Sequence, residues 1–364
     1  MALAAREWRD PLPFDTVYFG GGTPSQLPPD ELGRVLDACR THLRFAGPVV
    51  NPDPWVFLEA NPEDATAEAC AAWRALGVRT LSLGVQSFEG EALRFLGRHH
   101  SGSQARAVVE TALAAGFDTV SVDLIFGLPG QTVDAWRREL AAAVELGPQH
   151  LSCYQLTIHA GTPFGVKAKR GQLSELPEED QASLLELTHR FLADAGWPAY
   201  EVSNFARGPA HQSRHNRKYW DHTPYLGLGP SAHSLAISEA SFARGGEAGS
   251  VSARRWWNER GTRRWDNRLA AGERPVEADE VLGPEDLATE ALLLGLRTTA
   301  GIDLDRFTAR YGVDLLGANE ALVARLVEEG RLVVCVDAES RRWLVPTLSG
   351  LSVADGLAAA FDLA

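Results

Sequence analysis

Glycine and polar residues stand at the ends of successive apolar runs in the first half of this chain, and their types suit ligand binding. The first run, Thr16–Phe19, stops at three glycines, Gly20–Gly22, which are followed by Thr23 and Pro24. Glycines let a backbone approach a ligand with no Cβ in the way, and successive N–H groups can surround an anionic or zwitterionic group. Tight packing without a ligand would explain the same loop, so the glycines alone do not identify one.

Polar residues also end the later apolar runs. These runs finish on Glu59 with Asn61, on Gln86 with Ser87, on Asp123 and on Gln155. The carboxyl ends of parallel strands converge on one face of an α/β fold, where ligands bind. Any one of these residues could be a helix cap or a loop hydrogen-bonding group. Their recurrence in consecutive runs predicts one shared site.

The elements that would position these residues alternate along the chain. Strand-like runs are separated by amphipathic helical segments, several of which end in glycine. The runs are 16–22, Val56–Ala60, Thr80–Val85, Thr119–Phe126, His150–Ile158 and a weaker run at Pro198–Val202. This alternation predicts a parallel sheet covered by helices. A barrel and an open, doubly wound sheet both satisfy the pattern.

The stretch Glu201–Ser234 is rich in histidine, aromatic residues and glycine and has little regular period. Such a stretch is typical of a loop that serves a site. The alternative is an irregular connection whose histidines only form hydrogen bonds. The histidines concerned are His211, His215, His222 and His233. Residues 235–283, rich in arginine and tryptophan, read as a linker with a partly ordered helix.

The C-terminal segment has the pattern of a winged helix: three helices followed by a β-hairpin. The helices are expected at Pro284–Arg297, Asp303–Tyr311 and Asn319–Glu329, and the strands at Arg331–Val336 and Arg342–Pro346. DNA binding would need contacts to phosphates, yet Pro284–Ala364 carries 7 Arg, no Lys and 13 Asp or Glu. That acidic balance opposes phosphate binding and favours a packing or partner-binding module.

Composition bounds the class of protein. The chain has 364 residues, 45% hydrophobic and 23% charged, as expected of a soluble globular protein. No run is long and apolar enough for a membrane span, and no signal peptide is recognisable. Four distant cysteines, without metal-ligand spacing, are expected to be small buried thiols in a reducing cytoplasm. The net charge of −13 argues against general nucleic-acid binding.

A series of ordered motifs resembles one family, the coproporphyrinogen-oxidase-like radical S-adenosylmethionine (SAM) proteins, and within it the branch of HemW heme chaperones. The motifs are GGGTPS (Gly20–Ser25), LEANPED (Leu58–Asp64), LSLGVQSF (Leu81–Phe88), DLIFGLPGQT (Asp123–Thr132), YEVSNFA (Tyr200–Ala206), SRHNRKYW (Ser213–Trp220) and GLGPSAHS (Gly227–Ser234). They extend over most of the chain, so this resemblance is far more specific than any single glycine-rich loop.

The resemblance implies a partial (β/α)6 barrel and a C-terminal HemN-like domain with a winged-helix-like module. It divides the chain into a barrel (1–205), a His- and aromatic-rich connecting region (206–283) and the C-terminal module (284–364). It also assigns the strand-end cluster to SAM. The residues implied are Gly21, Gly22, Thr23, Glu59, Gln86, Arg98 and Asp123. A carboxylate can pair with the cationic groups of SAM, and an arginine can hold its carboxylate.

One departure from the family is large. Its first barrel strand carries a CxxxCxxC motif whose thiolates hold a 4Fe–4S cluster, and this sequence has no such motif. The resemblance therefore implies that the first strand and the cluster loop are missing, with a misassigned start or a truncated sequence favoured over evolved loss. Without the cluster, reductive cleavage of SAM is not expected, because the cofactor carries that chemistry.

Taken with the residues, the resemblance favours a cytoplasmic heme chaperone that holds heme and passes it to an acceptor protein. His215 is the first choice for an axial heme ligand and His233 the second, since imidazole ligates heme iron. The acceptor is unknown, with a membrane-associated respiratory component as one candidate, and a homodimer is left open. The alternatives are an oxygen-independent coproporphyrinogen III oxidase and, disfavoured by the acidic C-terminal module, a winged-helix DNA-binding regulator.

Overall fold

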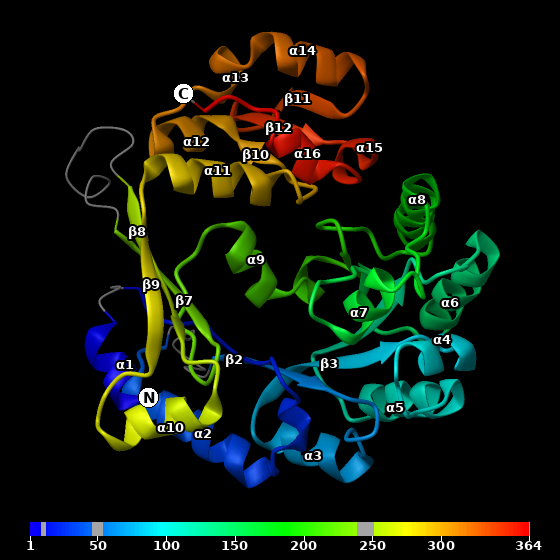
Figure 1. Cartoon of the computed structure of the whole chain (residues 1–364), viewed down its shortest axis with the longest axis vertical. Coiled ribbons are helices and arrows are strands. Elements are labelled where there is room, and N and C mark those ends of the chain that lie inside the picture. The colour runs from blue at the N-terminus through cyan, green and yellow to red at the C-terminus, as the bar shows by residue number, and fades with distance from the viewer. Residues whose placement is uncertain (9–11, 46–53, 239–250, 364) are drawn as a thin grey trace. The chain divides into compact units, whose positions relative to one another are not determined.

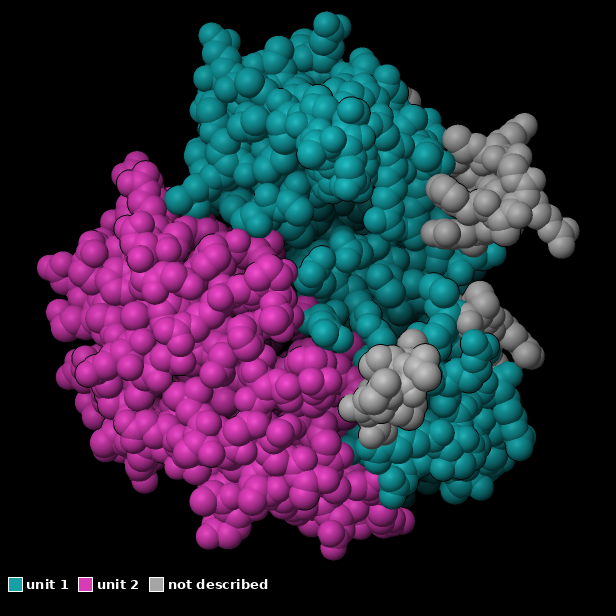
Figure 2. Space-filling model, turned by 180° about the vertical axis from the view of Figure 1, so that it is seen from behind, with its two compact units in different colours: residues 1–15, 35–53, 214–364 teal, residues 16–34, 54–213 magenta. Residues whose placement is uncertain are grey.

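The computed structural model describes residues 1–8, 12–45, 54–238 and 251–363, and Figure 2 colours the two compact units of the chain. Unit 1 comprises Met1–Asp15, Val35–Asp53 and Arg214–Ala364, and unit 2 comprises Thr16–Arg34 and Pro54–Ser213. The helix α2 (Pro29–His42) passes from one unit to the other. Each unit has its own sheet or sheets and its own candidate residues.

Unit 2 contains a six-stranded sheet whose spatial order follows the sequence. Its strands are β1 (Thr16–Phe19), β2 (Trp55–Ala60), β3 (Val78–Gln86), β4 (Thr119–Phe126), β5 (His150–Gln155) and β6 (Asn204–Ala206). The first five pair in parallel, so their carboxyl ends lie at one edge, as the alternating pattern predicts. The expected α/β class is confirmed, and closure into a partial barrel stays a prediction.

The sixth strand differs from the expectation. The run Pro198–Val202 forms only an isolated bridge, between Ala199 and Phe205. The strand is instead Asn204–Ala206, and it pairs with β5 in the antiparallel sense. Gly196 precedes this run and Pro198 begins it, and a proline has no N–H to donate to a neighbouring strand.

Helices follow the parallel strands and pack beside one another (Figure 1). They are α3 (Ala67–Ala75), α4 (Gly90–Phe95), α5 (Gly102–Ala114), α6 (Val133–Leu146), α7 (Pro163–Lys169) and α8 (Glu178–Asp194), with short 3-10 turns η1 (Pro24–Gln26) and η2 (Pro209–His211). Buried tryptophans fix this layer. Trp136 of α6, for example, is fully buried and donates a 2.8 Å hydrogen bond to the hydroxyl of Thr188 on α8.

Unit 1 contains a three-stranded antiparallel sheet where the sequence suggested a linker. The strands are β7 (His233–Ser238), β8 (Ser252–Asn258) and β9 (Val276–Leu282), and α10 (Thr262–Ala270) joins the last two. For the described residues 235–238 and 251–283 the linker expectation is therefore wrong, whereas the helix expected within it is confirmed as α10; residues 239–250 of the expected linker lie outside the described residues. These strands are hard to recognise in the sequence because they are rich in charged residues, and arginines of β8 face carboxylates of β9. Arg254 pairs with Asp279 at 2.8 Å and Arg255 with Glu280 at 3.0 Å.

The C-terminal module has the helices and hairpin that the pattern predicts. Its elements are α11 (Pro284–Gly295), β10 (Ile302–Asp303), α12 (Leu304–Tyr311), α13 (Leu315–Ala318), α14 (Glu320–Glu328), β11 (Leu332–Val336), β12 (Arg342–Pro346), α15 (Leu348–Leu351) and α16 (Ala354–Ala358). The remaining helices of unit 1 are α1 (Ala2–Glu7) and α9 (Arg214–Trp220). The sheet order is β10–β12–β11, which places β11 at an edge (Figure 1). Leu292, Phe307 and Leu344 are among the buried residues that join these helices to the sheet.

The cysteines follow the expectation in three places and depart from it in one. Cys39, Cys70 and Cys153 are buried, whereas Cys335 is exposed because it lies on the edge strand β11. Among the helices of the described ranges, none is long and apolar enough to cross a bilayer.

Candidate cofactor site

Glu59, at the end of β2, is held from two sides by residues of the first strand and its loop. The Tyr18 hydroxyl on β1 donates a 2.5 Å hydrogen bond to Oε1, and the Gly21 N–H donates a 3.2 Å bond to Oε2. Burial, followed by the charge of Glu59, raises the pKa of Tyr18 well above its ordinary value, so the phenol remains a donor. The carboxylate is therefore fixed in position before any ligand arrives.

Asp123, on β4, accepts hydrogen bonds from serine hydroxyls of its own strand and of a neighbouring strand. Ser82 of β3 donates at 3.1 Å to either carboxylate oxygen, and Ser121 donates at 3.4 Å. Burial raises the pKa of Asp123 to about 6, the negative charge of Glu59 adds to the rise, and the serine hydroxyls act against it. A second carboxylate that raises the cost of ionising Asp123 favours a cationic ligand beside it.

Gln86 and Arg98 meet over Gly84 on β3. A Cβ at Gly84 would lie 3.0 Å from Nε2 of Gln86, which would have to shift, and 3.7 Å from Nη2 of Arg98, an ordinary contact distance. Arg98 also donates a 3.2 Å bond to Oδ1 of Asn61, the residue after β2. Gln86 has a φ of 69°, a left-handed conformation that is costly for a residue with a Cβ and is often found at functional sites.

The glycine loop lies beside Glu59. A Cβ at Gly20 would meet the Tyr18 ring at 2.4 Å and Glu59 at 3.0 Å, so only glycine fits there. Gly21 has a φ of 100°, and both Gly21 and Gly22 are exposed. Thr23 is half-buried and precedes the turn η1. The loop therefore presents accessible backbone next to a fixed carboxylate.

The structure thus brings the predicted SAM residues of unit 2 to the same edge of the sheet. The acidic part of this candidate site contains Gly21, Glu59 and Asp123. The Gly21 N–H bonds to Glu59, and the charge of Glu59 acts on Asp123. Gln86 and Arg98 form a second part, linked to the end of β2 through Asn61.

Sequence reasoning missed three residues that hold these groups in place: Tyr18, Ser82 and Ser121. Tyr18 reads as one more apolar strand residue. The serines gave a signal, because Ser82, Ser121 and Ser152 each interrupt an otherwise apolar run. The sheet register places Ser82 directly opposite Ser121, and Ser152 opposite Asp123.

The predicted heme ligands lie in unit 1, on different elements. His215, on α9, contacts the Tyr219 ring at 5.0 Å in an edge-on arrangement, and Tyr219 contacts Tyr225 in the same way at 4.9 Å. Burial, followed by the cation of Lys218, lowers the pKa of His215 to about 4, and Asp15 acts against both effects. The imidazole is therefore neutral near pH 7, the form that ligates iron.

His233 is more accessible. It is exposed on β7 and stacks on Trp257, its cross-strand neighbour on β8, at 5.7 Å. The two other histidines of this stretch form hydrogen bonds, as the alternative interpretation expects. His211 bonds to the Thr119 hydroxyl in unit 2, and buried His222 bonds to Tyr311 and Glu290 in unit 1.

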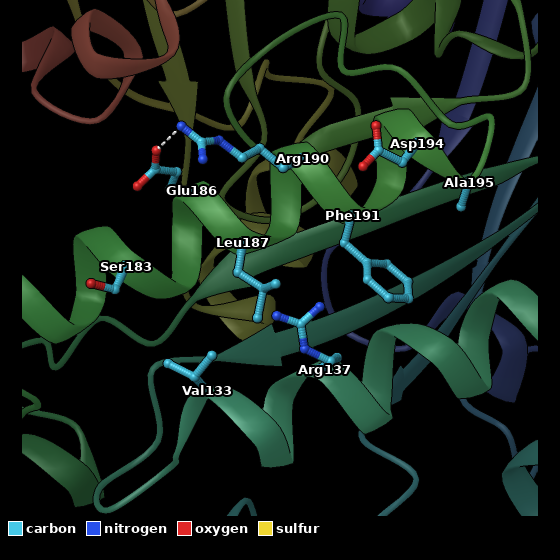
Figure 3. A pocket seen from close by; sticks show the side chains of 9 residues that line it. All are labelled: Val133, Arg137, Ser183, Glu186, Leu187, Arg190, Phe191, Asp194 and Ala195. Carbon is cyan, nitrogen blue, oxygen red and sulfur yellow. Dashed lines mark ion pairs between the residues drawn. The ribbon is translucent and has the colours of Figure 1, made fainter.

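An open groove of about 620 Å³ lies between α6 and α8, away from the predicted site residues. Figure 3 shows Arg137 of α6 and Leu187 and Phe191 of α8 directed into it. Its other polar side chains include Glu186 and Arg190, which pair with each other. None of the predicted cofactor residues lines this groove.

Comparison with known proteins gives the class first. Residues 2–142 match the Radical SAM superfamily and residues 282–339 match the HemN C-terminal domain. The structure resembles that of coproporphyrinogen III oxidase (HemN) from Escherichia coli, a radical SAM enzyme. The TM-score is 0.72 at 21% identity, over 95% of this chain and 77% of that one. At that identity the likeness supports the fold alone.

Sequence relatives then give the family. The heme chaperone HemW of Mycobacterium tuberculosis is 37% identical over 338 residues, which cover 90% of this chain and 80% of that protein. HemW of Bacillus subtilis is 31% identical over 315 residues, 86% of this chain and 78% of that protein. The chain belongs to the HemW heme chaperone family.

Proposed function

We propose that this chain is a heme chaperone that binds heme through unit 1, binds SAM at the strand ends of unit 2, and passes its heme to an acceptor protein. Family membership supports the general function, and the His215–Tyr219–Tyr225 contacts support the heme site. The single observation that carries the proposal is a histidine, neutral through burial, beside the ring of Tyr219, which in turn contacts Tyr225.

His215 fits an axial ligand better than His233 does. A neutral imidazole does not have to lose a proton before it binds iron, and aromatic rings can pack against a porphyrin. Arg214 and Arg217 are exposed on the same helix and carry the charge that would pair with heme propionates. His233, stacked on Trp257, is the second candidate.

The residues of unit 2 fit SAM. Glu59 and Asp123 would face its cationic ammonium and sulfonium groups or accept from its ribose hydroxyls. Arg98 would hold its carboxylate, and the exposed backbone of Gly21 and Gly22 would let the ligand approach closely. Thr23 and Gln86 would add a hydroxyl and an amide.

The residues of this chain do not fit a 4Fe–4S cluster. The sequence has no CxxxCxxC motif, and within the described ranges no group of three His, Cys, Asp or Glu side chains could hold a metal ion. Burial raises the pKa of Cys70 to about 11 and that of Cys153 still further, which disfavours the thiolate that an iron ligand requires. We therefore assign no reaction step to the cluster.

Transfer of heme can be tested by its kinetics. The heme-loaded protein is mixed with increasing amounts of membrane vesicles that carry heme-free respiratory cytochromes, and separately with apomyoglobin as a passive trap. A chaperone should deliver heme to its acceptor at a rate that rises with acceptor concentration. Equal, concentration-independent rates to both would show simple dissociation and would contradict the proposal.

Coproporphyrinogen III oxidase activity is the second candidate, because the fold resembles that of HemN. Fold does not separate the two functions. Incubation with coproporphyrinogen III, SAM, a reductant and an electron acceptor tests the oxidase in one direction: clear formation of protoporphyrinogen would favour it, whereas a chain without cluster ligands forms none under either function.

A further inference from the structure

The edge strand β11 is apolar and accessible, which is unusual for an edge. Val333, Val334 and Val336 are 45%, 41% and 64% exposed, and Cys335 is exposed as well. Proteins usually protect edge strands with charged residues, proline or a bulge. The strand Leu332–Val336 contains no charge and no proline, and its pairing with β12 is regular.

The other small sheet of unit 1 shows the usual protection. Its edge strand β9 carries Glu277, Asp279 and Glu280, so the approach of another strand would be opposed by charge. The edge of β11 has no such charges.

The free backbone groups of β11 can be identified from its hydrogen bonds. Thr347 N–H bonds to the Arg331 carbonyl at 2.9 Å, and Asp337 N–H bonds to the Arg341 carbonyl at 3.0 Å. Backbone groups of successive residues in an antiparallel strand point alternately to opposite sides. Odd-numbered residues of β11 therefore face β12, and the N–H and C=O groups of Leu332, Val334 and Val336 face the free edge.

We propose that β11 pairs antiparallel with β11 of a second copy of this chain, about a two-fold axis at Val334. In this register all five residues of the strand are paired, and the three free N–H and C=O pairs bond to their equivalents. Arg331, just before the strand, then lies opposite Asp337 of the second copy, just after it. The strand is thus complementary to itself in both charge and hydrogen bonding.

The register makes a chemical prediction. Val333 lies opposite Cys335 of the second copy, at a pair without mutual hydrogen bonds, where Cβ atoms are about 4.5–5.5 Å apart. A cysteine at 333 would therefore be placed to form a disulfide with Cys335 across the axis. Two such bonds would form per dimer. A disulfide between residues 333 and 335 of the same strand is less favourable, because the two positions are about 6.6 Å apart along the strand.

The test combines sedimentation with cross-linking of the full chain. Under reducing conditions a dilution series should show a weak, reversible monomer–dimer equilibrium, as expected of a small interface. Arg331→Glu should raise the dissociation constant at least about fivefold, because two attractive pairs become repulsive. Arg325→Glu is the matched control: Arg325 shares the ion-pair partner Glu329 with Arg331 but lies on α14, and its variant should behave as wild type.

Under mild oxidation, Val333→Cys should form a covalent dimer, whereas wild type and the Val333→Cys/Cys335→Ser double variant should form little. A wild type that stays monomeric at every concentration would overturn the proposal. So would cross-linking of wild type as readily as Val333→Cys, since that would place Cys335 on the axis. The other cysteines are buried and do not complicate the measurement.

Discussion

The hydroxyl of Tyr18 donates a 2.5 Å hydrogen bond to Glu59, a residue 41 positions further along the chain. The bond joins the first strand to the end of the second, and the Gly21 N–H holds the other oxygen of the same carboxylate. Glu59 is therefore oriented by the protein rather than by a ligand, which reduces the ordering cost of binding a cation.

Removal of that orientation should weaken SAM binding without unfolding the chain. In Tyr18→Phe the ring remains and only the hydroxyl is lost, so we expect a loss of SAM affinity of roughly 3- to 10-fold, in line with one hydrogen bond to a charged group. Isothermal titration calorimetry measures it, and Tyr219→Phe, in unit 1, serves as the control. Unchanged affinity in Tyr18→Phe would show that Glu59 does not contact the ligand.

Arg98 should act on one part of SAM only. If its guanidinium holds the carboxylate, Arg98→Ala should lower SAM affinity about 10- to 100-fold, the range for a charge-assisted pair. Binding of 5′-methylthioadenosine, which has no carboxylate, should change little. An equal loss for both ligands would mean that Arg98 supports the fold of the site and not the carboxylate.

Asp123 should make SAM binding depend on pH. Because burial raises its pKa to about 6, it is mostly protonated at pH 5 and mostly ionised at pH 7. A ligand that prefers the carboxylate should therefore bind up to about tenfold more weakly at pH 5. Asp123→Asn should bind SAM more weakly than wild type at pH 7, and its affinity should not change between pH 5 and pH 7. A profile with the wild-type slope in the variant would assign the titration to another group.

The same raised pKa makes the folded state less stable as the pH rises, whereas a carboxylate whose pKa is lowered by an ion pair makes it more stable. The folded state holds the Asp123 proton up to about pH 6, whereas the unfolded chain releases it near its ordinary value of 3.8. Its contribution to stability is thus fully present below pH 3.8 and is lost as the pH rises through about 6.

His150 should destabilise the fold in acid. It is buried, bonds to Ser121 and to the Tyr200 hydroxyl, and burial lowers its pKa to about 3. The unfolded chain takes up the proton near pH 6.5 but the folded one does not, so stability falls as the pH drops below 6.5. At pH 5 this costs about 2 kcal/mol.

His150→Gln isolates that effect. Urea unfolding followed by tryptophan fluorescence should show the variant less stable than wild type at pH 7.5, with the difference smaller by about 2 kcal/mol at pH 5. A difference that is the same at both pH values would show that His150 does not resist protonation.

Much of unit 2 could be predicted because its signals are local. Strand and helix patterns alternate, and the topology of parallel strands then forces Glu59, Gln86 and Asp123 to one edge. Tyr18 and Ser82 could not be assigned from the sequence, since their role depends on which side chain lies across the sheet. The antiparallel β6 was missed because a three-residue strand leaves almost no periodic pattern.

Unit 1 was harder to predict for two physical reasons. The strands β8 and β9 carry cross-strand ion pairs in place of an apolar alternation, so their sequence reads as a polar linker. The exposure of Cys335 depends on the strand order β10–β12–β11 and cannot be read from the apolar run around it. The winged-helix-like pattern itself was visible, because its helices and hairpin follow one another in sequence.

The most direct test of the central claim is a titration of hemin into the full chain, followed by its Soret absorption, with His215→Ala and His233→Ala beside the wild type. We expect wild type and His233→Ala to bind hemin saturably. In His215→Ala the Soret band should shift and binding should be about tenfold weaker or more, because one iron ligand is lost. Identical spectra and affinities in wild type and His215→Ala would contradict the assignment of the heme site, and absence of saturable binding in wild type would contradict the proposed function.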